Sequence, residues 1–289
     1  MSKIKIKKII FSFIFITLVV VAIGGWLDDK GSDYAEATFN RALVAFGIAK
    51  GLNGVISVAQ GTEVALQPAG IGVNFTPGEI LDPINDLIEQ FSWIMLASTA
   101  SIGIQKILLA ISIWPWFSGF VIFLLLLVVL SYWYKPLQQS SWRPLLIKSM
   151  LVFVFLRFSV PLIAIGSEFV YSQFLSAQYI EATQELEKTT DKISSINKVD
   201  EKNLSDSKSK SVWQSAKEMY GSAAAAMDIS ARIDRYKQAA TDATKYAINL
   251  IVVFIFQTIL FPLLFLLIVY QVLKKLVKLE WMTGVFEAN

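Results

Sequence analysis

Residues 114–134 read WPWFSGFVIFLLLLVVLSYWY and carry no charged side chain. Two tryptophans stand near one end of this stretch, and a Tyr-Trp-Tyr run closes the other end. Aromatic belts about 20 residues apart match the roughly 30 Å hydrocarbon core of a bilayer, because an α-helix rises about 1.5 Å per residue. The stretch therefore predicts a transmembrane helix.

Three other stretches are long and apolar enough to cross a bilayer, namely 9–27, 150–171 and 248–273. The first of these follows a run with four lysines, so it is either a retained signal anchor, which we favour, or a cleaved signal peptide. Together with 114–134, these stretches predict an all-α integral membrane protein with four transmembrane helices.

The lysines and arginines that flank these spans fall in three segments, namely 1–8, 135–149 and 274–289. With four spans, all three segments lie on the same side of the membrane. Short cytoplasmic segments are enriched in Lys and Arg, so both termini are expected in the cytoplasm. The lysine-rich start and the short loops are typical of a bacterial inner-membrane protein.

A further apolar stretch, 91–112, raises the question of a fifth span. A fifth span would place the basic segments on opposite sides of the membrane, and Gln105 and Lys106 interrupt the stretch. We therefore expect a helix at 83–112 that lies against the membrane or against a neighbouring subunit. A re-entrant helix with Lys106 in a wet place is the alternative.

The extracytoplasmic segment 28–113 contains a helix-start signal. Thr76 and Glu79 have the spacing of a capping box, in which the threonine hydroxyl and the glutamate carboxylate each accept a backbone amide hydrogen bond. Asp82 and Pro83 repeat the signal six residues later. These residues predict the start of the helix at 83–112, and we give them a structural role rather than a ligand-binding one.

The second extracytoplasmic segment, 172–247, predicts an antiparallel helical hairpin whose arms continue the third and fourth spans. Apolar and small residues recur at spacings of three and four in both arms, as in a coiled coil. The seam consists of Leu175, Tyr179, Ala182, Leu186, Thr189, Ile193 and Ile196 in the first arm and of Met219, Ala223, Ala226, Ser230, Ile233, Lys237, Ala240, Thr244 and Ala247 in the second. We expect this seam to close the hairpin on itself, and packing between subunits is the alternative. The polar run 198–211 has no apolar period and predicts a loop.

Arg157 is the sharpest candidate for a functional residue, because an arginine inside a membrane span is costly and usually faces water or a protein interior. It lies about 12 Å from the cytoplasmic end of the span 150–171, and we find no carboxylate at the same depth in the other spans. Arg157 is therefore expected to snorkel to lipid phosphate, to face a wet cavity or pore, or to pair across subunits. Gln257 and Thr258 would form hydrogen bonds between helices or would line such a pore.

The composition excludes several kinds of chemistry. The 289 residues are 55% hydrophobic and 17% charged, and they include no cysteine and no histidine. This removes disulfides, thiolate chemistry, the usual zinc sites and histidine acid–base catalysis. Because no catalytic or metal-ligating motif is present either, we expect no enzyme, no cofactor, no metal and no nucleic-acid partner.

The layout of four spans, internal termini and two external segments resembles large-pore channel subunits such as connexins, innexins and calcium-homeostasis modulators. The resemblance concerns the plan of the chain and assigns no residue. It implies a homo-oligomeric channel or pore for ions or small solutes, in which Arg157 would favour anions. The alternative is a membrane-anchored interaction protein whose hairpin binds a periplasmic partner. Membrane lipids are expected partners in both cases.

Overall fold

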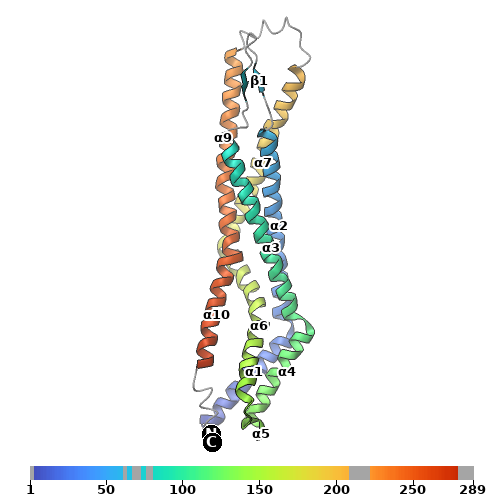
Figure 1. Ribbon diagram of the computed structural model, residues 1–289, viewed down its shortest axis with the longest axis vertical. Helices are drawn as coiled ribbons and strands as arrows, with labels where there is room; N and C mark the ends of the chain where they lie inside the picture. The colour runs from blue at the N-terminus through green and yellow to red at the C-terminus, as the bar shows by residue number, and fades with distance from the viewer. Residues whose placement is uncertain (1–2, 61–63, 67–72, 76–80, 208–221, 279–289) are drawn as a thin grey trace. The chain divides into compact units, whose positions relative to one another are not determined.

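The computed structural model describes residues 3–60, 64–66, 73–75, 81–207 and 222–278, and nearly all of them are helical (Figure 1). The elements are α1 (Lys3–Gly24), α2 (Trp26–Gln60), β1 (Val64–Leu66), β2 (Val73–Phe75), α3 (Asp82–Ile113), α4 (Pro115–Trp133), α5 (Lys135–Gln138), α6 (Arg143–Val170), the π-helix η3 (Tyr171–Leu175), α7 (Ser176–Ser207), α9 (Ser222–Ile255), the π-helix η5 (Phe256–Leu260) and α10 (Phe261–Lys278). The two short strands pair antiparallel, with Val64 opposite Phe75.

Five of the described helical stretches are long and apolar enough to cross a membrane, which agrees with the predicted helical membrane protein. They are Trp26–Gln60, Asp82–Ile113, Pro115–Trp133, Arg143–Lys198 and Ile233–Lys275. A shorter apolar helix covers Ile9–Gly24. Two of the five, Trp26–Gln60 and Asp82–Ile113, lie in the segment for which the sequence predicts no span.

The chain divides into two compact units. The first unit consists of Met1–Asn40, Ala100–Gln173 and Phe256–Asn289, and the second unit consists of Arg41–Thr99 and Phe174–Ile255. Several long helices thus contribute one part to each unit. The two units are described separately below.

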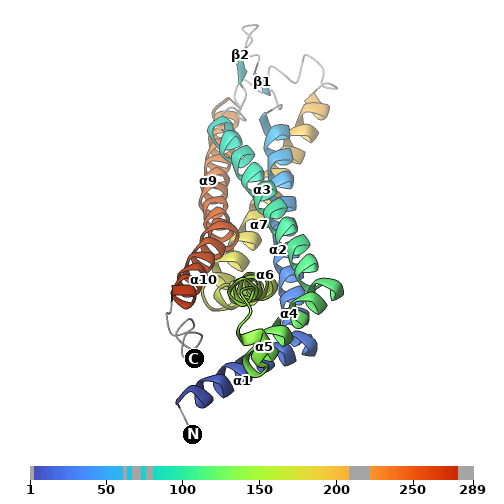
Figure 2. The same cartoon turned by 60° about the horizontal axis from the view of Figure 1, so that its bottom comes forward.

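In the first unit, α4 packs against both α1 and α6, and α10 packs against α6 (Figures 1 and 2). Buried apolar side chains from α1, α4 and α6 form a core, which includes Phe15, Leu125 and Met150. Glycine at position 25 allows the chain to turn between α1 and α2, because its φ of 66° lies in the left-handed region that other residues rarely adopt. This turn brings the start of α2 back to the packed helices.

The proline in the last predicted span is accommodated by the π-helix that directly precedes it. Pro262 lacks a backbone N–H, and its ring would collide with the carbonyl of Thr258 in a regular α-helix. The π-helical residues Phe256–Leu260 widen the turn at this point. Pro161, by contrast, stands inside α6 without a π-helical turn beside it, since η3 begins ten residues later.

In the second unit, α7 and α9 pack along each other as the arms of the predicted hairpin (Figure 1). The predicted seam of the first arm is confirmed through Ile193, because its members from Leu175 to Ile193 are buried. Two details of the prediction are wrong. Helix α7 continues to Ser207, although a loop was expected from Lys198, because a lack of apolar periodicity does not prevent a polar sequence from forming a helix.

The second detail concerns the seam of α9. Lys237 is exposed and its neighbour Tyr236 is buried, followed by Ala239, Ala240 and Ala243. Burying the charge of a lysine without a partner costs much more free energy than a small rotation of the helix about its axis. The ring of Tyr236 therefore occupies the buried position that was predicted for Lys237. The alanines leave room for α7 to approach closely.

Candidate functional site

Arg157 lies in the interior of the first unit, on α6, and only 1% of its surface is exposed. Its Nη1 donates to Oδ1 of Asp28 at 2.7 Å, and its Nη2 donates to Oδ2 of the same carboxylate at 2.5 Å. The third donor, Nε, reaches Oγ of Ser118 at 2.9 Å. The guanidinium is therefore held by a bidentate ion pair and by one neutral hydrogen bond.

Four helices supply this cluster. Asp28 stands in the first turn of α2, where the helix dipole favours a negative charge. Ser118 comes from the first turn of α4, and Ser112, near the end of α3, donates its hydroxyl to the Arg157 carbonyl at 2.8 Å. All of these residues belong to the first unit, so the ion pair ties its helices together.

One helical turn beyond the ion pair, α2 and α6 approach each other closely at Gly31. A Cβ atom added to this glycine would lie 3.1 Å from the Cα of Pro161 and 3.2 Å from its Cβ. At such distances Pro161 would have to shift by a few tenths of an ångström to admit a Cβ atom at position 31. The contact places Asp28 within reach of Arg157, which is one turn before Pro161 on the same helix.

The three environments expected for Arg157 did not include a carboxylate of the same chain, and the structure differs from them in this respect. Asp28 directly follows the predicted span 9–27, and the turn at Gly25 directs it towards α6. In addition, α6 begins at Arg143, so Arg157 lies about 21 Å along this helix from its first residue rather than near its start. The sequence signal that could have revealed the pair is an unmatched aspartate at the end of one span and an unmatched arginine inside another.

Lys106 also has a carboxylate partner. Its ammonium group forms an ion pair with Glu36 of α2 and lies over the ring of Phe39 at 4.6 Å from the centroid. Both partners are substantially exposed, at 32% for the Lys106 side chain and 55% for Glu36. This pair belongs to the first unit and stands two turns further along α2 than Asp28.

Gln257 and Thr258 both lie in η5 and are both buried. Gln257 is 3% exposed, and its Oε1 and Nε2 have no hydrogen-bond partner among the residues that the structure describes. It lines a cavity of about 220 Å³ in the first unit, together with apolar residues of α6 such as Val160 and Ile163. Arg157 lines neither this cavity nor the larger one described below, so these three predicted residues do not form one site.

The predicted helix start is described only in part. Thr76 and Glu79 lie outside the described residues. Asp82 is the first residue of α3, and its Oδ1 accepts a hydrogen bond from Nε2 of Gln60 at 2.6 Å. The second start signal in the sequence therefore marks the beginning of the helix.

Neither metal clusters nor known relatives assign a chemistry to these residues. Within the described part of the chain, no group of three or more Asp and Glu side chains is placed to hold a metal ion. No protein-family model, no curated protein and no solved structure matches the chain.

Proposed function

We propose that this protein is a membrane-anchored interaction protein, in which the first unit holds the chain in the bilayer and the second unit meets a protein partner outside the cytoplasm. The observation that carries this proposal is the enclosure of Arg157. A pore that used Arg157 to favour anions would need its guanidinium in water. Instead, its donors go to Asp28 and Ser118, and the carboxylate neutralises its charge inside the protein.

The proposal includes four membrane crossings, made by α1, α4, α6 and η5 with α10, and both termini in the cytoplasm. The exposed pair of Lys106 and Glu36 supports a place outside the hydrocarbon for α2 and α3, since charges exposed to lipid are costly. Asp29, Lys30 and Asp33 in the first turns of α2 support the same place. In this arrangement the Arg157 pair lies near the outer ends of α1 and α4 and about midway along α6.

Exposed apolar side chains in the second unit support a protein partner. Trp93 of α3 is 64% exposed, and Val44 and Val58 of α2 are more than half exposed. On helices that lie outside the hydrocarbon, large apolar side chains in water mark an interaction surface. Tryptophan in particular contributes strongly to binding when a partner covers it.

Ion-flux measurements on purified protein in liposomes separate an anchor from a pore. The wild type, Arg157→Ala and Arg157→Glu are compared in the same lipid and at the same protein density. We expect no flux above that of empty liposomes in any of them. A wild-type flux whose anion preference falls in Arg157→Ala and inverts in Arg157→Glu would contradict the proposal and favour the homo-oligomeric pore.

The interaction surface is tested with two matched tryptophan variants. Trp93→Ser removes the side chain that is 64% exposed in the second unit, and Trp142→Ser removes a tryptophan just before α6 that is 74% exposed. The measurement is the amount of a protein that co-purifies with the wild type in a fixed ratio from native membranes. This amount should fall about tenfold or more with Trp93→Ser and stay unchanged with Trp142→Ser. Equal retention with both variants would exclude Trp93 from the interface.

A further inference from the structure

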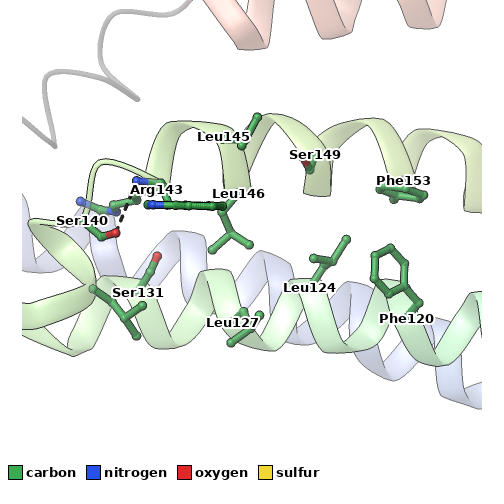
Figure 3. A pocket seen from close by; sticks show the side chains of 12 residues that line it. Phe120, Leu124, Leu127, Ser131, Ser140, Arg143, Leu145, Leu146, Ser149 and Phe153 are labelled. Carbon is green, nitrogen blue, oxygen red and sulfur yellow. Dashed lines mark hydrogen bonds between the residues drawn. The ribbon is translucent and has the colours of Figure 1, made fainter.

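A second cavity of the first unit lies between α4 and α6 and has a volume of about 390 Å³. Figure 3 shows how its lining changes from one end to the other. At one end stand Ser131 of α4, Ser140 and Arg143, and at the other end stand Phe120 and Phe153. Leucine side chains of both helices, together with Ser149, line the length between them, so the cavity is polar at one end and mainly apolar over the rest.

The polar end is built around a buried cation. Arg143 is the first residue of α6 and is 7% exposed. Its guanidinium carbon lies 5.3 Å from the centroid of the Tyr132 ring, so an aromatic face supports the charge on one side. The backbone N–H of Arg143 donates to the Ser140 carbonyl at 3.2 Å, and this turn fixes the start of α6 beside the cavity.

The shape of the cavity defines the class of ligand. From Phe120 to Ser131 the lining follows α4 for about 16 Å. A ligand that fills this space carries an acyl chain for the leucine and phenylalanine side chains and an anion for Arg143. Arginine suits the phosphate of a phospholipid, and basic pockets between membrane helices on the cytoplasmic side are known to bind anionic lipid headgroups.

We infer that the cavity between α4 and α6 binds one anionic phospholipid, with its phosphate at Arg143 and an acyl chain between Leu124, Leu127 and Leu146. The hydroxyl of Ser140 stands at the same end as Arg143 and can donate a further hydrogen bond to the headgroup, whereas Ser131 already donates its hydroxyl to the Val128 carbonyl at 2.7 Å. This site does not depend on whether the protein is an anchor or a pore, because it needs only the packing of α4 on α6.

The test measures the lipids that purified protein retains, by native mass spectrometry after equilibration in mixed micelles of phosphatidylglycerol and diacylglycerol, which has the acyl chains but no phosphate. The wild type should prefer phosphatidylglycerol about tenfold or more, as one charge-assisted contact to a phosphate predicts. Arg143→Gln should abolish this preference. Lys148→Gln removes an exposed charge one turn further along α6 and should retain it.

A second variant tests the apolar part of the site. Ser149→Phe fills the cavity while Arg143 stays unchanged, and it should reduce retention of both lipids. Arg143→Lys keeps a positive charge and should retain more phosphatidylglycerol than Arg143→Gln. This comparison distinguishes loss of the charge from a general failure of position 143 variants to fold. Soluble glycerol phosphate, which lacks the acyl chain, should not compete.

Three results would overturn the inference. The first is an unchanged lipid preference in Arg143→Gln. The second is an equal loss in Lys148→Gln, which would indicate general surface attraction. The third is displacement of the lipid by glycerol phosphate alone, which would assign the site to a free phosphate compound.

Discussion

Removing the charge of Asp28 is the sharpest perturbation of the buried ion pair. Asp28→Asn keeps the shape of the side chain, but it leaves the guanidinium of Arg157 buried with only part of its hydrogen bonds. Breaking a buried pair by changing one partner costs about 3–5 kcal/mol. The Asp28 side chain is 16% exposed, and Ser118 still accepts one hydrogen bond from Arg157. We therefore expect Asp28→Asn to lower the free energy of unfolding by about 3 kcal/mol, at the lower end of this range.

A double-mutant cycle isolates the pair from other effects. Arg157→Met leaves a partly exposed carboxylate that water can reach, so this variant should cost about 1 kcal/mol. Replacing both partners removes both charges and should also cost about 1 kcal/mol. The coupling free energy is then about 3 kcal/mol in favour of the pair.

Detergent-induced unfolding of the purified protein, followed by circular dichroism, measures the four corners of this cycle. Asp29→Asn serves as the control, because Asp29 follows Asp28 in the same helix turn and is exposed. It should change the free energy of unfolding by less than about 0.5 kcal/mol. A coupling free energy near zero, with both single variants as stable as the control, would refute the argument that the pair ties the helices together.

Two further predictions concern packing. Gly31→Leu should lower the free energy of unfolding by about 1–3 kcal/mol, because the new side chain meets the backbone of Pro161. Gly47→Leu, at an exposed position on the same helix, is the control and should be neutral or slightly stabilising. Equal effects of the two substitutions would refute the close approach of α2 and α6 at Gly31. Tyr236→Phe removes a hydrogen bond of 2.9 Å to Oδ1 of Asn197 inside the hairpin and should cost about 1–2 kcal/mol in a thermal unfolding assay. An unchanged unfolding temperature would show that this bond does not contribute.

The features that follow a local pattern were predictable from the sequence. The stretch 114–134 forms α4 almost end to end, because an apolar run bounded by aromatic residues has only one stable form in a bilayer. Asp82 begins α3, as its position before a proline predicts. The α7 seam through Ile193 follows from its spacing alone.

The features that depend on how distant segments meet were not predictable. The pair of Asp28 and Arg157 joins residues 129 positions apart, and it depends on the turn at Gly25 and on the space left by Gly31. Spacing also could not select Tyr236 over Lys237 in α9, because the predicted seam of this helix consists mainly of alanine, serine and threonine, whose small side chains distinguish the buried face poorly.

The most direct test of the account measures the water accessibility of the Arg157 cluster. Because the sequence contains no cysteine, an introduced cysteine is the only thiol that a reagent can modify. Ser112→Cys places a thiol of nearly the same size next to the Arg157 backbone, at a position that is 3% exposed. Ser32→Cys places one at an exposed position of α2 as the reference. The account predicts that a charged, water-soluble thiol reagent modifies Ser32→Cys in the folded protein and leaves Ser112→Cys unmodified until it unfolds. Modification of both at similar rates would show a water-filled path beside Arg157 and would contradict the closed anchor.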